Sequence, residues 1–251
     1  MMDLSTVITH LHELKLEGFV ENLESLLDRV PESREAVLKT LQTLSQAEIA
    51  SRQERSVSYR IEQARFVKIQ TVETFDFNYI AATKKIKNRY LKLLEADCTE
   101  QGLSALFVGT AGLGKTHLAR ALGYRLCQKN RRVLFTTIHA MALNLTTAES
   151  TGSLKKTLEQ YVQPALLILD EVGYVSLREV ESNLVFQVIS ARYDRQRSTV
   201  VTTNRPFGEW NQIFHNDAIA HAILDRLAER SEVFHVEGPS YRDTHKQSLK
   251  S

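Results

Sequence analysis

Residues 104–116 read SALFVGTAGLGKT. The stretch Gly109–Thr116 consists of a glycine, four further residues and then Gly-Lys-Thr, which is the pattern of a phosphate-binding loop. The apolar run before it is typical of a buried strand, and residues 117–126 after it, HLARALGYRL, have helical spacing. A strand, a glycine-rich loop and a helix therefore stand in the order that this motif requires, and the sequence predicts a nucleotide site here.

The residue types in this stretch explain its chemistry. Gly109, Gly112 and Gly114 let the backbone turn tightly, so that its N–H groups point into a cup at the start of a helix. Lys115 adds a positive charge for the β- and γ-phosphates, and the Thr116 hydroxyl is a ligand for Mg²⁺. The predicted nucleotide-binding residues are Gly109, Thr110, Ala111, Gly112, Leu113, Gly114, Lys115, Thr116 and His117.

Length and composition limit the class of protein. The chain has 251 residues, of which 43% are hydrophobic and 25% charged, enough for one α/β domain and a smaller element. A net charge of +2 gives no general attraction to nucleic acid, so a DNA site would need local clusters of basic residues. The two cysteines have no metal or disulfide spacing, the chain starts with polar residues, and it contains no long apolar run. We therefore expect a cytoplasmic protein without a membrane partner.

Beyond the loop, apolar strands alternate with helical segments. Strands are expected at 104–109, 132–137, 165–169, 198–203 and 232–236, and helices at 117–126, 139–161, 184–193 and 218–230, the second of these in one or two pieces. This pattern predicts an α/β fold with a parallel, doubly wound sheet of about five strands. About 15 residues follow the last strand, so little or no C-terminal lid is expected. A neighbouring subunit would then close the site, which predicts a homo-oligomer with ATP at the subunit junctions.

Polar residues end two of these strands. Asp170 and Glu171 follow residues 165–169, and Asn204 follows residues 198–203. Ligands bind beyond the carboxyl ends of the strands in such sheets. Asp170 is predicted to hold Mg²⁺ beside Thr116, and Glu171 to act as the general base for the attacking water. Asn204 is expected to orient that water or contact the γ-phosphate; its alternative is a turn cap.

Negative charge on the transferred phosphoryl group calls for a cation from outside the loop. Arg226 is our prediction for an arginine supplied in trans, and Arg242 for a second one in cis. Arg192 and Arg205 are weaker candidates, and any of the four can be a structural ion pair. Because no Asn-Lys-x-Asp guanine signature occurs, ATP is favoured over GTP.

The amino-terminal part of the chain lacks strand signals. Residues 1–68 are predicted to form a small all-helical domain and residues 69–251 the nucleotide-binding domain. Phe75 and Phe77 lie at the junction, where one lines an adenine pocket or both pack between domains. Two basic runs, residues 52–68 and 83–92, are solvated helix faces or sites for DNA or a partner.

Several of these stretches together resemble the IstB-type helper ATPases of insertion-sequence transposons, in the AAA+ group that includes the helicase loader DnaC. The resemblance covers nearly the whole chain. It rests on residues 109–119, 167–174, 202–210, 223–226, 75–77 and 240–242. NRPFGEW at 204–210 separates this family from other proteins with a phosphate-binding loop.

The resemblance implies an AAA+ ATPase that uses ATP and Mg²⁺, assembles on double-stranded DNA, and helps a cognate transposase choose its target. Basic faces around residues 84–92 and at Lys155 and Lys156 would hold the DNA backbone. Two alternatives stay open. One is a DnaC-like replicative helicase loader, which would prefer single-stranded DNA, and the other is a protein in which ATP only gates binding and is not hydrolysed.

Overall fold

The computed structural model describes residues 4–241 and divides the chain into two compact units. These are Met1–Tyr59 and Arg60–Ser251, and the boundary falls within helix α3 (Arg34–Gln63). The predicted domain boundary after residue 68 lies further along the chain.

The first unit is helical. It contains α1 (Leu4–Glu13), α2 (Glu17–Leu27), the short 3₁₀ helix η1 (Pro31–Ser33) and most of α3. Apolar residues three or four positions apart bring one face of each helix together. The small core that results consists of Val7, Leu11, Leu23, Leu27 and Leu38.

The second unit is built on a five-stranded parallel sheet. The strands are β1 (Ser104–Gly109), β2 (Val133–Thr137), β3 (Leu166–Val172), β4 (Ser198–Thr203) and β5 (Ser231–Val236). Their order is β2-β3-β4-β1-β5, and all described pairings are parallel. The predicted fold class is therefore confirmed. The carboxyl ends of β1, β3 and β4 lie side by side in the middle of this sheet.

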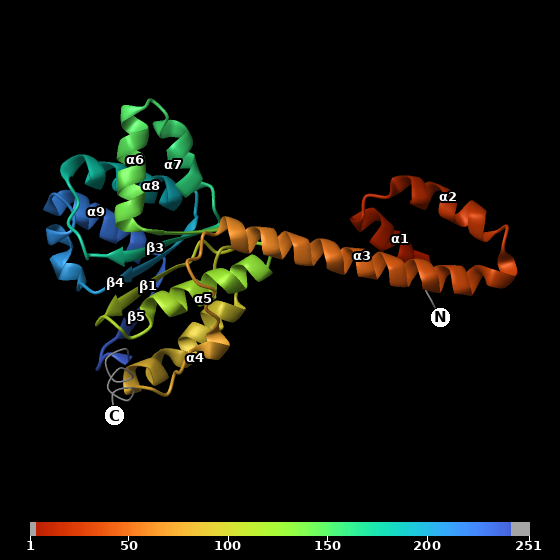
Figure 1. The fold of residues 1–251 in the computed structure, drawn as a ribbon, viewed down its shortest axis with the longest axis horizontal. Helices are drawn as coiled ribbons and strands as arrows, with labels where there is room; N and C mark the ends of the chain where they lie inside the picture. Colours follow the sequence, from red (N-terminus) through yellow and green to blue (C-terminus); the bar gives the residue numbers. More distant parts are fainter. Residues whose placement is uncertain (1–3, 242–251) are drawn as a thin grey trace. The chain divides into compact units, whose positions relative to one another are not determined.

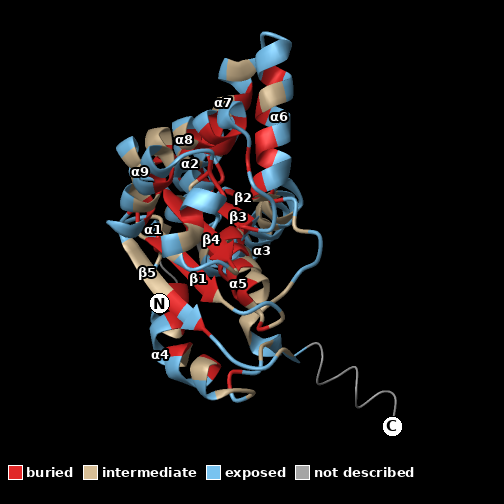
Figure 2. Cartoon of the chain, turned by 90° about the vertical axis from the view of Figure 1, so that its left-hand side faces the viewer, coloured by how far each residue is buried: buried red, intermediate tan, exposed pale blue. Residues whose placement is uncertain are grey.

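Helices cover both faces of the sheet (Figure 1). One face carries α4 (Ala81–Glu95) and α5 (Lys115–Gln128). The other carries α6 (Ile138–Ser150), α7 (Leu154–Val162), α8 (Glu179–Asp194) and α9 (Asp217–Ala228), with the 3₁₀ helix η3 (Phe207–Gln212). A further 3₁₀ turn, η2 (Val72–Thr74), precedes α4. The strands are buried between the two helical layers, as Figure 2 shows. None of the described helices combines the length and apolarity needed to cross a bilayer.

One strand differs from its expected length. Strand β3 does not stop at Leu169 but continues through Asp170 and Glu171 to Val172. Its register with β4 shifts on the way, because Leu169 pairs with Val201 and Val172 pairs with Thr203. Two residues of β3 therefore face one residue of β4, which is the definition of a β-bulge. Two charged residues interrupt the apolar run, so the sequence predicts an end at Leu169, although Asp170 and Val172 are also buried.

Candidate nucleotide site

The backbone of the loop at Gly109–Thr116 is confined from two sides. Gly112 and Gly114 have φ values of 82° and 81°, in the left-handed region that favours glycine. A Cβ atom at Gly114 would lie 2.4 Å from the Phe75 ring, and one at Gly112 would lie 2.2 Å from Ser240 Oγ. Both contacts are too short, so the close approach of these neighbours requires glycine at each position.

Lys115 opens helix α5 and turns back over the loop. Its side chain is buried, and Nζ donates to the carbonyl oxygens of Gly109 and Thr110, both at 2.7 Å. The ammonium group is thus held at the mouth of the loop, next to the amino end of α5. The helix dipole adds partial positive charge at the same place. This concentration of positive charge and N–H donors suits a phosphate group.

Two hydroxyl groups converge on one carboxylate. Thr116 Oγ1 donates to Asp170 Oδ1 at 2.8 Å, and Thr202 Oγ1 donates to the same oxygen at 2.5 Å. Asp170 is only 3% exposed. Hydroxyl and carboxylate oxygens are the ligands that Mg²⁺ prefers, so Thr116 and Asp170 together fit that ion.

A cavity of about 630 Å³ joins these groups. Its walls include Gly112–His117, Asp170, Glu171 and Thr202, together with aromatic residues from elsewhere in the chain. The volume falls in the range of about 300–1,000 Å³ that is usual for ligand pockets. A phosphate-binding loop at one side and two carboxylates at the other fit a nucleoside triphosphate with its metal ion.

Apart from Phe75, the residues of the aromatic wall are not among the predicted site residues. Phe75 both lines the cavity and packs edge-on against Phe77 and His117, with ring centroids 4.7 and 5.2 Å apart. Tyr79 and Tyr241 also line it and pack against each other at 4.7 Å. Neither tyrosine is predicted as a site residue, because isolated aromatics carry no spacing signal, although Tyr241 lies in the stretch 240–242 that carries the family resemblance.

His117 ties the loop helix to the segment before α4. Its Nε2–H donates to the Thr71 carbonyl oxygen at 2.8 Å, and the ring lines the cavity. The Tyr241 N–H donates to the Gly112 carbonyl oxygen at 3.2 Å. The loop is therefore contacted both by residues that precede β1 in the chain and by residues that follow β5.

Several predicted residues are not in the cavity wall. Among the loop residues, Gly109, Thr110 and Ala111 do not line it. Asn204 does not line it, and its Oδ1 is buried without a hydrogen-bond partner in the part of the chain that is described. Arg242 lies outside the described residues. The prediction for each stays a prediction.

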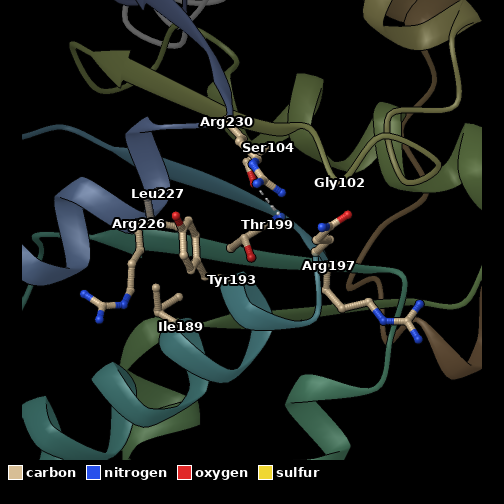
Figure 3. Close-up of a pocket in the computed structure, with 10 residues that line it drawn as sticks. Gly102, Ser104, Ile189, Tyr193, Arg197, Thr199, Arg226, Leu227 and Arg230 are labelled. Carbon is tan, nitrogen blue, oxygen red and sulfur yellow. Dashed lines mark hydrogen bonds between the residues drawn. The ribbon is translucent and has the colours of Figure 1, made fainter.

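Arg226 lies at the opposite edge of the sheet. Figure 3 shows it with Arg230, beside Tyr193 of α8 and Thr199 of β4. The same pocket is lined by Ser104, the first residue of β1, whereas the loop follows the last residue of that strand. Five residue steps separate the two ends, about 17 Å at about 3.3 Å per residue. That span exceeds an arginine side chain, so Arg226 cannot serve the loop of its own chain from this position.

The two weaker arginine candidates have structural partners. Arg192 is fully buried and donates to the carbonyl oxygens of Tyr161, Val162, Pro164 and Ser198 and to Thr199 Oγ1. Burial lowers the pKa of this guanidinium to about 9. Arg205 pairs with Glu209 at 2.9 Å. Arg192 is thus a structural link between α8 and the starts of β3 and β4.

The order of the strands, the loop after β1 and the acids at the end of β3 define an AAA+ type of P-loop nucleotide-binding protein. Comparison with known proteins gives the particular group. The chain belongs to the family of IstB-like ATP binding proteins, whose sequence model matches residues 9–249.

Relatives in this family come from insertion sequences. The chain is 33% identical, over 92% of its length, to an ATP-binding protein of insertion sequence IS5376 from Geobacillus stearothermophilus, and the match covers 91% of that protein. It is equally identical, over 92% of its length, to the ATP-binding protein of insertion sequence IS21 from Pseudomonas aeruginosa, with 86% of that protein covered.

Solved structures confirm the fold. The DnaC helicase loader has a TM-score of 0.59 at 21% identity, with 66% of this chain and 96% of that chain covered. DnaA from Aquifex aeolicus, in a complex with AMPPCP, has a TM-score of 0.57 at 20% identity, with 72% and 54% covered. At these identities the likeness supports the AAA+ fold alone.

Proposed function

We propose that this protein is an ATPase of DNA transposition, which assembles on duplex DNA with Mg²⁺ and ATP and helps a cognate transposase engage its target. One observation carries the enzymatic part. Lys115, Thr116, Asp170 and Glu171, from two separate segments of sequence, meet in one cavity at the carboxyl edge of the sheet. Family membership supports ATP as the nucleotide.

Each residue has a separate task in this proposal. Lys115 exchanges its loop carbonyl partners for phosphate oxygens and holds the β- and γ-phosphates. Thr116 and Asp170 would hold Mg²⁺, which neutralises charge on the phosphates when bound. Glu171 accepts a proton from the attacking water.

Phosphate release by the wild type, Lys115→Ala and Glu171→Gln tests this assignment. Lys115→Ala removes a charged donor that is worth about 1.5–3 kcal/mol, so nucleotide affinity should fall about 10- to 100-fold. Glu171→Gln should bind nucleotide normally and lose about 10²- to 10⁴-fold in turnover. Wild-type turnover in Glu171→Gln would remove the general base. A wild type that binds ATP without hydrolysing it would favour the switch alternative.

The position of Arg226 supports an oligomer. Since its guanidinium cannot reach the loop of its own chain, it can complete only the site of a neighbour. In its own chain it is held over the Phe186 ring, 4.9 Å from the centroid, and Arg226 Nη1 donates to the Ala222 carbonyl oxygen at 2.9 Å.

Mixing two inactive variants tests this arrangement. Arg226→Ala keeps the loop and Lys115→Ala keeps the arginine, so a junction between them can hold one complete site. With equal amounts and random assembly, half of the loops are intact and half of their neighbours carry the arginine, so turnover should recover to about a quarter of wild type. A mixture as inactive as its components, under conditions where the wild type assembles, would rule out Arg226 in trans.

Helix α4 is our proposed contact with the DNA backbone. Lys84, Lys85 and Lys92 are exposed on it, and no ion pair engages them within the described residues, whereas Arg89 pairs with Glu232. Replacing the three lysines with glutamine should weaken duplex binding and reduce the slope of log affinity against log salt by about 2.7, from about 0.9 per phosphate contact. Lys129→Gln is a control, because Nζ of Lys129 donates to the Glu95 carbonyl oxygen. An unchanged slope in the triple variant would exclude this helix.

The partner and the place of action complete the proposal. The insertion-sequence origin of the relatives supports a transposase as the partner, and the cytoplasm as the place where ATP and DNA are both available. Likeness to the DnaC helicase loader keeps a DnaC-like loader as the alternative. Co-purification with the transposase of the same insertion sequence, and tighter binding to duplex than to single-stranded DNA, would support transposition. A helicase partner and a preference for single strands would support the loader.

A further inference from the structure

Asp170 and Glu171 are neighbours in the chain, yet both line the nucleotide cavity. In a regular strand, successive side chains point to opposite faces of the sheet. One of the two carboxylates would therefore point away from the cavity if β3 ended as an ordinary strand. Something in this structure has to turn the second acid.

The β-bulge in β3 provides that turn. Asp170 and Glu171 lie together between the pairs Leu169–Val201 and Val172–Thr203, so both face the single residue Thr202 of β4. Glu171 has a φ of 61°, in the left-handed region that a residue with a side chain rarely adopts. Such a conformation persists only where neighbouring contacts hold it, and it is common at functional sites.

The Thr202 hydroxyl contacts both members of the bulge. Its Oγ1 donates to Asp170 Oδ1 at 2.5 Å and accepts the Glu171 backbone N–H at 3.1 Å. Thr202 is 2% exposed, so water does not compete for these bonds. The hydroxyl hydrogen bonds the Asp170 carboxylate, and a lone pair of the hydroxyl oxygen accepts the Glu171 backbone N–H.

We propose that Thr202 is a positioning residue for ATP hydrolysis, whose single hydroxyl sets the orientation of both acids. The bond to Asp170 leaves that carboxylate aligned with Thr116 for the metal, and the bond to the Glu171 N–H holds the bulge that directs the Glu171 side chain into the cavity. This inference rests on the proposed ATPase function. In this proposal Thr202 contacts neither the nucleotide nor the attacking water, and it acts only through Asp170 and Glu171.

Substitutions at Thr202 separate the hydroxyl from the methyl group. Thr202→Val keeps the shape of the side chain but leaves the buried Glu171 N–H and Asp170 Oδ1 without this partner. Thr202→Ser keeps the hydroxyl and loses only the methyl group. Thr199→Val is the matched control, because Thr199 is 3% exposed, lies on the same strand at its other end, and accepts a hydrogen bond from Arg192 Nε.

The experiment measures kcat for ATP, the KM for ATP, the Mg²⁺ concentration at half-maximal rate, and the thermal midpoint of the full-length protein. In Thr202→Val we expect a kcat lower by about 10- to 100-fold, as for misplacement of a catalytic group by a fraction of a bond length or more. The half-maximal Mg²⁺ concentration should rise, and the KM for ATP should change less than kcat. Thr202→Ser should restore kcat to near wild type. Thr199→Val should lower the thermal midpoint and leave kcat unchanged.

Three results would overturn the inference. They are a folded Thr202→Val with wild-type kcat and Mg²⁺ dependence, a Thr202→Ser as impaired as Thr202→Val, and a Thr199→Val that loses kcat to the same extent. If Thr202→Val does not fold by circular dichroism, Thr202→Ala removes the same hydroxyl with no added bulk and is judged by the same criteria. Absence of ATP turnover in the wild type refutes the proposed function instead, so the two failures can be told apart.

Discussion

Because Glu171 has a left-handed conformation, its replacement by glycine should have opposite effects on stability and on activity. A φ of 61° costs a residue with a side chain about 1–2 kcal/mol. Glycine relieves that cost but loses about 0.5–1 kcal/mol through the greater freedom of its unfolded chain. Glu171→Gly should therefore stabilise the nucleotide-binding unit by about 0–1.5 kcal/mol, which is up to about 6 °C in thermal midpoint for a domain of this size. The same change removes the proposed base, so turnover should fall about 10²- to 10⁴-fold.

Thermal unfolding without nucleotide, followed by circular dichroism, checks the first half, and phosphate release checks the second. Glu171→Gln separates the effects, because it keeps the backbone strain and loses only the base, so its midpoint should match wild type. Gln196→Gly is the control for strain, since Gln196 has a φ of 51° in the turn after α8. A Glu171→Gly protein less stable than Glu171→Gln would refute the account of strain held at this position.

Three further predictions concern other parts of the second unit. Gly114→Ala should bind nucleotide at least about tenfold more weakly, because its Cβ would lie 2.4 Å from Phe75 and its φ is 81°. Titration with a fluorescent ATP analogue measures this affinity. Gly208→Ala is the control and should bind normally, because no atom lies within 4 Å of the added Cβ. Arg192→Met should lower the free energy of unfolding by about 3–5 kcal/mol in denaturant titrations, because four buried carbonyl groups lose their donor. A loss below about 1 kcal/mol would contradict the assigned structural role. Burial raises the pKa of the Cys98 and Cys127 thiols to about 12, so a disulfide reagent at pH 8 should label them only as fast as the unit unfolds; rapid labelling of the native protein would show that they are accessible.

The sequence predicts the parts of this site that depend on local order. Gly109–Thr116 is recognisable because strand, loop and helix are consecutive in the chain. The acids at 170 and 171 are recognisable because a buried apolar strand runs directly into them. The alternation of strands and helices likewise predicts the parallel sheet, since helices that connect parallel strands cover both faces and bury strands that are apolar on both sides. These inferences need no knowledge of which distant residues meet.

The rest of the site depends on such meetings. Tyr79 and Tyr241 reach the cavity from positions far apart in the chain, and neither belongs to a periodic pattern. The role of Thr202 follows from a register shift between β3 and β4, which a hydrophobicity pattern does not encode because it does not say which residues of two strands pair. The sequence predicts both acids at the edge of the sheet, but in a regular strand two adjacent side chains would point to opposite faces. The backbone geometry is needed to explain how both face the same cavity.

The separation of the loop from Arg226 also limits the kind of assembly that can form. If Arg226 completes a neighbour's site, as proposed, one copy must present the carboxyl edge of its sheet to a neighbour that presents the amino edge, so the contact joins two different surfaces. A two-fold dimer brings the same surface of each copy together, and it could complete both sites only if both edges, about 17 Å apart along β1, met their partners at once. Contacts between unlike surfaces instead repeat into a ring or a helical filament. With a non-hydrolysable ATP analogue, mass photometry should therefore show species larger than a dimer, and Arg226→Glu should reduce them. A population that stops at the dimer while turning over ATP would show that Arg226 does not complete the site in this way.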